Sequence, residues 1–198
     1  MARKVVAIVG SYRMEDKIDT AVEAILEGAR EKGATTHIIY LTEHGMELRP
    51  NGPTGAEQPG EERGKCAQED ALDLILKEIA EADALVLGSP VSCGNVTAIF
   101  QQFMGRLPGK DYRPWSRVVL RIRIRRTGRK AVLVASSAMP GFLIPIFTST
   151  RSSLRGTARV LGARPVGTMW IGLAANSPRL ELSARRKARA LRIGRRLA

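Results

Sequence analysis

The sequence has 198 residues, of which 44% are hydrophobic and 26% are charged, and its formal net charge is +13. These proportions are typical of one globular domain spanning 1–198, and they exclude a disulfide-stabilised scaffold because the chain has only two cysteines. Its apolar runs are too short to span a bilayer or to form a secretory signal, so we expect a cytoplasmic protein without membrane contact.

The positive charge is concentrated in two segments of the sequence. Residues 106–130 contain ten basic residues and one acidic residue, residues 179–198 contain eight and one, and the remaining chain is net acidic. We interpret 109–129 as a basic insertion and 179–198 as a basic C-terminal helix, and such segments are usually solvated faces. Neither shows basic residues interleaved with the aromatic residues that stack on bases, so we expect no nucleic-acid partner and regard a polyanion-binding role as secondary.

Hydrophobic periodicity predicts five strands that alternate with five helices. Short apolar runs have the length of buried strands, and apolar residues repeated at spacings of three and four mark the helices between them. This alternation predicts a three-layer α/β sandwich. The strands are expected at about residues 5–9, 35–41, 84–87, 131–135 and 166–171, and the helices at about residues 18–32, 71–79, 96–103, 145–161 and 180–197.

The turn between the first strand and the first helix carries polar groups suited to a phosphate. It offers backbone N–H groups from Gly10 onward, the hydroxyl groups of Ser11 and Thr20, the cation of Arg13 and the N-terminus of a helix. An ordinary strand-to-helix loop, whose serine and threonine cap the helix, accounts for the same residues. The turn alone leaves both interpretations open, and G-x-G-x-x-G and a complete P-loop are absent from the sequence.

Three of the predicted strands end in polar loops that contain glycine, at residues 10–20, 89–95 and 136–141. In a doubly wound parallel sheet with the strand order 2-1-3-4-5, strands one, three and four are neighbours, and ligands bind beyond their carboxyl ends. We therefore expect the three loops to form one site. The first loop would take a phosphate, and the other two would offer backbone N–H and C=O groups to the edge of a flat heterocycle.

The residues of these loops resemble those of the NADPH-dependent FMN reductase and iron–sulfur flavoprotein family. The resemblance rests on Gly-Ser-Tyr-Arg at 10–13, on Ala-Asp-Ala-Leu-Val-Leu-Gly-Ser-Pro-Val at 82–91 and on Gly-Asn-Val-Thr at 94–97. It covers nearly the whole chain in the same order of elements. It implies an α/β, flavodoxin-like fold with a five-stranded parallel sheet, bound FMN, and a homodimer or homotetramer.

The resemblance also implies roles for individual residues. Asp19 stands where many family members carry asparagine, so its carboxylate would repel a phosphate unless only its backbone N–H is used. Many members have an aromatic residue where Ser92 or Cys93 stands, which implies looser packing against the flavin ring. The positions that match the phosphate site are Ser11, Arg13, Asp19 and Thr20; those along the isoalloxazine ring are Pro90, Val91, Ser92, Gly94 and Asn95; and the third loop matches more weakly at Ser136, Ser137 and Gly141.

The sequence departs from the iron–sulfur members in its long loop after the second strand. Where those members carry a tight cysteine cluster, this chain has Arg49, Gly52 and Gly55, and only Cys66 follows. A [4Fe–4S] cluster needs four thiolates, so we predict no iron–sulfur centre and no metal site. We expect Cys66 and Cys93 to be buried small hydrophobic residues. For Cys93, which lies in a site loop, a redox-sensitive thiol is the alternative.

Together these features predict an FMN-binding, NAD(P)H-dependent oxidoreductase of the flavin or quinone reductase type. Hydride would pass from NAD(P)H to FMN and then to a second, small-molecule electron acceptor, and this chemistry requires no acidic or basic side chain. We therefore predict no catalytic residue. The alternative is a degenerate flavodoxin-like module that binds a partner or a polyanion through its arginine-rich segments.

Overall fold

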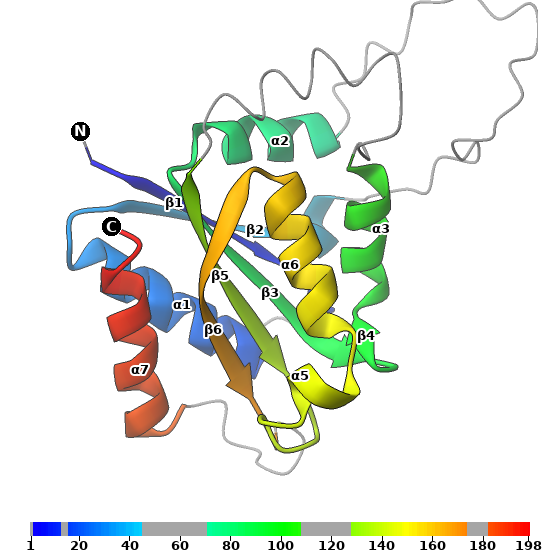
Figure 1. The fold of residues 1–198 in the computed structure, drawn as a ribbon. Helices are drawn as coiled ribbons and strands as arrows, with labels where there is room; N and C mark the ends of the chain where they lie inside the picture. Colours follow the sequence, from blue (N-terminus) through cyan, green and yellow to red (C-terminus); the bar gives the residue numbers. More distant parts are fainter. Residues whose placement is uncertain (1, 13–15, 45–70, 108–127, 174–181) are drawn as a thin grey trace, which may run out of the picture.

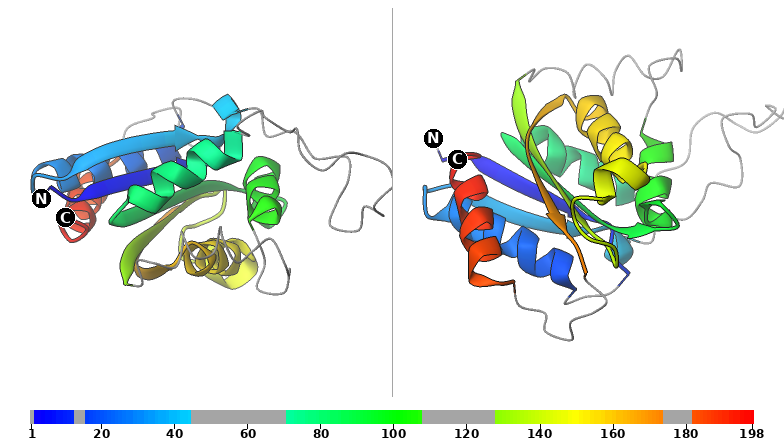
Figure 2. Two further views of the ribbon diagram at one scale, coloured as in Figure 1. Left: turned by 90° about the horizontal axis from the view of Figure 1, so that it is seen from above. Right: turned by 60° about the horizontal axis from the view of Figure 1, so that its bottom comes forward.

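The computed structural model describes residues 2–12, 16–44, 71–107, 128–173 and 182–198. The strands are Lys4–Val9 (β1), Thr35–Tyr40 (β2), Ala84–Ser92 (β3), Asn95–Val96 (β4), Arg129–Ser136 (β5) and Ala163–Ile171 (β6). The parallel strands follow the order β2-β1-β3-β5-β6, and β4 pairs only with the end of β3. With helices on both faces of this sheet (Figures 1 and 2), the predicted flavodoxin-like sandwich and its strand order are confirmed.

The helices lie near their predicted positions, with one difference. They are Lys17–Arg30 (α1), the 3₁₀ helix Leu41–His44 (η1), Ala71–Glu81 (α2), Ala98–Arg106 (α3), Ile144–Phe147 (α5), Thr150–Val160 (α6) and Ala184–Arg195 (α7). The single helix predicted over 145–161 is divided, because Thr148 adopts an extended backbone with φ −131° and ψ 152°. In the described part of the chain, no helix combines the length and the apolar character needed to cross a membrane.

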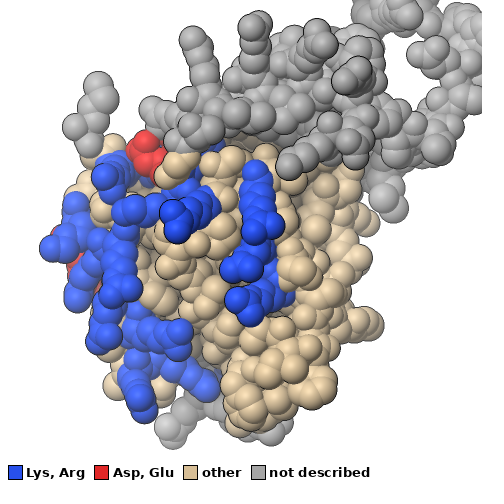
Figure 3. All heavy atoms as spheres, viewed as in Figure 1, with Lys and Arg blue, Asp and Glu red and all other residues tan. Residues whose placement is uncertain are grey.

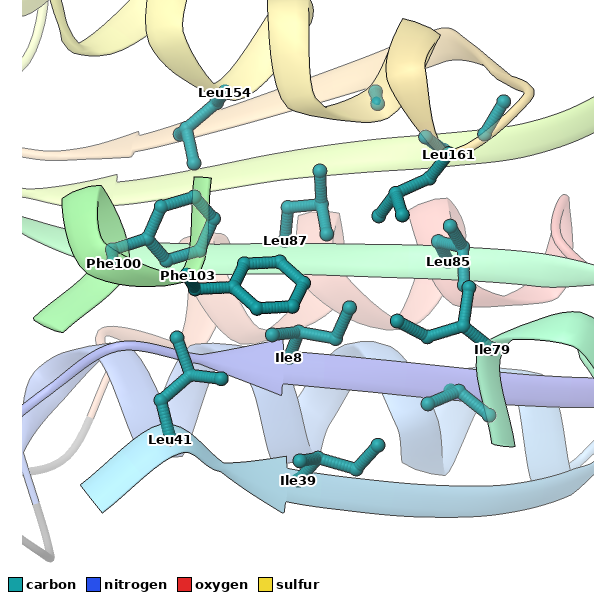
Figure 4. Packing of buried hydrophobic residues seen from close by; sticks show 14 of the residues in the cluster. Ile8, Ile39, Leu41, Ile79, Leu85, Leu87, Phe100, Phe103, Leu154 and Leu161 are labelled. Atoms are coloured by element: carbon teal, nitrogen blue, oxygen red, sulfur yellow. The ribbon is translucent and has the colours of Figure 1, made fainter. Parts of the chain in front are cut away.

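Both faces of the sheet are buried, which is usual for parallel strands. Alternate residues of β1 serve different clusters: Ile8 belongs to the cluster formed with α2, α3 and α6, whereas Ala7 belongs to the one formed with α1 and α7. Figure 4 shows the first cluster, in which Phe100 and Phe103 of α3 lie beside Leu87. The two rings pack edge to face, with their centroids 5.9 Å apart. This packing fixes the helices that flank the carboxyl ends of the strands.

Arg129 belongs to the sheet, although the sequence analysis assigned it to the basic insertion over 109–129. It is the first residue of β5, and it is buried, whereas residues 109–127 lie outside the described part of the chain. Its guanidinium donates to the carbonyl oxygens of Ile79 at 2.8 Å and Ala80 at 2.9 Å. These carbonyls lie in the last turn of α2, where helical partners are missing and a cation is favourable.

Replacing Arg129 by methionine should therefore lower the free energy of unfolding by about 2–3 kcal/mol, since two charge-assisted hydrogen bonds are lost, one buried and one partly buried. Chemical denaturation would measure this change. Arg164, which is exposed on the neighbouring strand, provides the matched control. Arg164→Met should change stability by no more than about 0.5 kcal/mol. Equal stability of the two variants would show that Arg129 contributes only its apolar side-chain atoms.

Candidate functional site

The carboxyl ends of β1, β3 and β5 lie side by side. β1 pairs with β3 and β3 pairs with β5, both in parallel. The backbone N–H of Gly10 donates to the carbonyl oxygen of Gly88 at 2.9 Å, and Pro90 lies opposite Ser136 in the register of β3 and β5. The three loops singled out in the sequence therefore start from neighbouring positions at one edge of the sheet, as the strand order requires.

The segment predicted as a polar loop over 89–95 is a β-hairpin instead. β3 continues to Ser92 and returns as β4, with Ser92 opposite Asn95. The two connecting residues both have positive φ, 47° at Cys93 and 75° at Gly94, as a type I′ turn requires. Cys93 is exposed at this tip, so the prediction that it is buried is wrong. Cys66, for which the same was predicted, lies outside the described residues. A cysteine at the position usually taken by asparagine or aspartate concealed the turn in the sequence.

The tip of the hairpin is attached to the start of α6. The carbonyl oxygen of Gly94 accepts hydrogen bonds from the backbone N–H of Ser149 at 2.9 Å and from its hydroxyl at 3.2 Å. The hydroxyl of Ser153 donates to Oδ1 of Asn95 at 2.8 Å. The interruption between α5 and α6 therefore positions the loop that the resemblance assigns to the flavin ring. Sequence reasoning missed both serines, because their partners are more than fifty residues away in the chain.

A buried hydroxyl pair connects this hairpin to the loop after β1. Oγ1 of Thr97 donates to the carbonyl oxygen of Gly10 at 2.5 Å, and the backbone N–H of Thr97 donates to Oγ of Ser89 at 3.1 Å. Both side chains are almost completely buried. Thr97 stands at the N-cap position of α3, yet its hydroxyl makes no capping bond to that helix. It holds two of the three loops together, a role that its place in the sequence did not indicate.

The phosphate-side residues lie at both ends of the first turn. Ser11 follows β1 after Gly10 and is buried, and Thr20 is half-buried in the first turn of α1. The hydroxyl of Thr20 lies 3.4 Å from the carbonyl oxygen of Asp16. Arg13 lies outside the described residues. Two of the predicted phosphate ligands are thus placed on either side of the turn, and the role of Arg13 remains a prediction.

Two carboxylates cap the N-terminus of α1. Oδ1 of Asp16 accepts the N–H of Lys17 at 2.6 Å. The side chain of Asp16 also accepts the backbone N–H of Asp19, and Oδ2 of Asp19 accepts the N–H of Asp16 at 2.9 Å, so the two aspartates form a capping box. The alternative in which Ser11 and Thr20 cap this helix is therefore wrong, because aspartates do so. The carboxylates also stand at the helix end that would otherwise attract an anion.

The third loop packs against the end of β6. The backbone N–H of Ser137 donates to the carbonyl oxygen of Ile171 at 2.9 Å, and its hydroxyl accepts the N–H of Met139 at 3.1 Å. A Cβ atom at Gly141 would lie 3.0 Å from the carbonyl oxygen of Trp170, so glycine permits the close approach. The third loop is therefore shaped by contacts with the edge strand, while Ser136 ends β5 at the site itself.

Comparison with known proteins now decides the family. Residues 3–172 match the family described as NADPH-dependent FMN reductase. The chain belongs to this family. Over 103 residues it is 40% identical to an iron–sulfur flavoprotein of Methanocaldococcus jannaschii, an alignment that covers 52% of this chain and 51% of the relative. An iron–sulfur flavoprotein of Archaeoglobus fulgidus is 31% identical over 103 residues, covering 52% and 48%. The chain thus spans about half the length of these curated relatives.

Solved structures support the fold of this FMN reductase family member. An NAD(P)H:quinone oxidoreductase from Methanothermobacter marburgensis superposes with a TM-score of 0.66 at 20% identity, covering 100% of this chain and 96% of the other. A flavodoxin from the domain Archaea gives a TM-score of 0.55 at 12% identity, covering 98% and 95%. At these identities the likeness concerns the fold alone, and it agrees with the observed strand order.

The donor set at the three strand ends fits the FMN for which the family is known. Ser11 and Thr20 offer hydroxyl groups to a phosphate, and the hairpin after β3 offers backbone groups to a planar ring. The carboxylates of Asp16 and Asp19 at the start of α1 do not fit, because their negative charge would repel a phosphate. The site of this FMN reductase family member therefore suits a phosphorylated flat cofactor, with a local charge that opposes the phosphate.

Proposed function

We propose that this chain binds FMN at the carboxyl ends of β1, β3 and β5 and acts as an NAD(P)H-dependent oxidoreductase of the flavin or quinone reductase type. The observation that carries the proposal is the hydrogen bond from Thr97 to Gly10, because it joins the phosphate-side loop to the ring-side hairpin through buried atoms. A cofactor with a phosphate at one end and a ring at the other needs these two loops in a fixed relation. The family to which the chain belongs supports the same choice.

In this proposal the phosphate is held by Ser11, Arg13 and Thr20, and the isoalloxazine ring lies along Pro90–Asn95. Bound FMN supplies the hydride chemistry, so the chain itself needs no acidic or basic side chain at the reacting atoms. Its backbone N–H groups in the hairpin and in the loop 136–141 would orient the ring and favour negative charge on it. The two cysteines of the sequence are too few for a [4Fe–4S] cluster, so we infer an oxidoreductase without one.

The proposal includes two partners. The first is a small-molecule electron acceptor, which takes the electrons after NAD(P)H has supplied them. The second is another copy of the chain, in a homodimer or homotetramer of the kind that the family resemblance implies. Size-exclusion chromatography with light scattering would measure the assembly directly.

Titration of the purified protein with FMN tests the proposal. Flavin fluorescence should be quenched to a defined end point at micromolar FMN, and NAD(P)H should then bleach the flavin absorbance in the absence of oxygen. Folded protein that takes up no FMN at these concentrations would contradict the proposal, and would favour the degenerate binding module. Uptake of FMN without bleaching by either nucleotide would retain the binding site and reject the nucleotide-dependent activity.

A substitution at Asp19 tests whether its charge weakens the binding of the phosphate. Asp19→Asn should bind FMN about tenfold more tightly, since one negative charge near the phosphate is removed while the amide oxygen can still accept the N–H of Asp16. Riboflavin, which lacks the phosphate, is the control ligand and should bind both proteins equally. The same gain for riboflavin as for FMN would show that Asp19 acts through loop stability instead of charge.

A further inference from the structure

Arginine side chains gather on both sides of the edge strand β6. α6 carries Arg151, Arg155 and Arg159 at spacings of four, which places them along one side of that helix. Figure 3 shows basic side chains in a column over α6 and in a larger group over α7, with few acidic side chains between. We call this surface the basic face, and we define it by the exposed residues Arg151, Arg155, Arg159, Arg164, Arg185, Arg189, Arg192 and Arg196.

The members from α7 are those on the side that meets β6. Arg189 donates to the carbonyl oxygen of Thr168 in β6 at 3.2 Å, and the other three share its helical stripe. On the α1 side of the same helix the cations are paired instead, since Lys187 meets Glu27 at 3.7 Å and Arg195 meets Glu31 at 2.6 Å. α7 therefore has paired cations, Lys187 and Arg195, on its α1 side and, among the described residues, unpaired arginines on the side toward β6.

Charges of the basic face are not balanced by nearby carboxylates. Residues 128–173 and 182–198 contain no aspartate or glutamate at all. Among the described residues, none of the eight arginines forms an ion pair. Such a surface carries a positive potential that attracts anionic partners, and guanidinium groups bind phosphate through paired N–H donors.

The apolar residues indicate which class of anion the face suits. Within β6, α6 and α7, as far as the structure describes the chain, Val166 is the one exposed large hydrophobic side chain. Phe142, Ile146 and Phe147 are also exposed, but they lie in or beside α5, before the first arginine of α6 and outside the basic face. A protein partner would need an apolar centre to its interface, and a membrane would need bulky apolar side chains to insert. The phosphate backbone of a nucleic acid needs neither, because its binding is driven by cations and counterion release.

We propose that the basic face binds the backbone of duplex nucleic acid without sequence preference. Within β6, α6 and α7, in the described part of the chain, no aromatic side chain is exposed, and the exposed Phe142 and Phe147 lie outside the basic face. The face itself therefore offers phosphate contacts and no base stacking, which suits a duplex better than a single strand. The sequence pointed away from a nucleic-acid partner because its two basic segments are of the kind that usually form solvated faces and are not interleaved with aromatic residues. The α6 arginines fall outside both segments, in the remainder of the chain that is net acidic. This proposal is independent of the flavin site.

Fluorescence anisotropy with a labelled mixed-sequence duplex of about two helical turns tests it. The full chain should bind at low salt, and the logarithm of the association constant should fall with the logarithm of salt concentration at about −0.9 per phosphate contacted. Replacing Arg151, Arg155 and Arg159 together by glutamine should reduce that slope by roughly 2 to 3, and should weaken binding at least tenfold at low salt. Residues 109–127 stay unchanged in every variant, so the difference reports the basic face.

The matched control removes three cations that are already paired, by replacing Arg30, Lys187 and Arg195 with glutamine. It changes the net charge equally and should leave the salt slope unchanged, provided that circular dichroism shows both proteins folded. If the two triple variants lose duplex affinity equally, the loss depends on net charge alone, and the proposal is overturned. Absence of duplex binding at low salt would also overturn it, as would binding of anionic lipid vesicles in preference to the duplex.

Discussion

Gly194→Ala should destabilise the protein by about 3 kcal/mol, although alanine is the better helix former. A Cβ atom at this position would lie 1.8 Å from the carbonyl oxygen of Ile25 and 2.9 Å from the backbone nitrogen of Ala29. The backbones of α7 and α1 are therefore in direct contact there, and neither atom can move without displacing a helix. Overpacking of this kind costs about 1–3 kcal/mol, and backbone atoms on both sides favour the upper end. Chemical denaturation would measure the loss.

Gly156 provides the matched control, because a Cβ atom there would meet nothing within 4 Å although the residue lies inside α6. Gly156→Ala should stabilise the protein by up to about 1 kcal/mol, through helix propensity alone. The two identical substitutions should thus have opposite signs. Stabilisation by Gly194→Ala would show that α7 does not pack on α1 at this distance. The position of α7, which carries half of the arginines of the basic face, would then be wrong.

The close contact between α1 and α7 is also a part of the fold that the sequence did not predict. Apolar runs and their spacing located the strands and helices, since both faces of a parallel sheet must be covered. The close contact at Gly194 could not be predicted in this way, because the sequence around a glycine in a basic helix does not tell whether that glycine faces solvent or another backbone. Gly28, on the facing helix, would bring a Cβ atom within 2.2 Å of the carbonyl oxygen of Leu191. Such contacts depend on pairs far apart in the chain.

For the candidate site, the location could be predicted from the sequence, but the hydrogen bonds within it could not. Strand order alone brought the three loops to one edge of the sheet, so the place of the site followed from the alternation of strands and helices. Its internal connections did not, because Thr97 and Ser149 act on partners in other elements. The basic face was not predicted for the same reason. α6 and α7 are separate in sequence, and their arginines come together only because both helices flank the edge strand β6.

Thr97→Val should weaken FMN binding about tenfold and lower the free energy of unfolding by about 1–2 kcal/mol. The substitution keeps the shape of the side chain and removes the hydroxyl that donates to Gly10, leaving a buried carbonyl without that donor. The loop after β1 then loses its connection to the hairpin after β3, so the two halves of the proposed cofactor site are no longer held in one arrangement. Ordering them on binding costs affinity. FMN titration and chemical denaturation of the same samples would measure both effects.

Thr157→Val separates this positioning role from a general loss of stability. Thr157 is also buried, and its hydroxyl donates at 2.9 Å to the carbonyl oxygen of Ser153 within α6. Its replacement removes the same chemical group and should cost similar stability, yet FMN affinity should stay unchanged. Thr97→Ser, which keeps the hydroxyl, should recover most of the affinity. If the two valine variants lose FMN affinity equally, the bond from Thr97 to Gly10 contributes only to folding and does not pre-form a cofactor site.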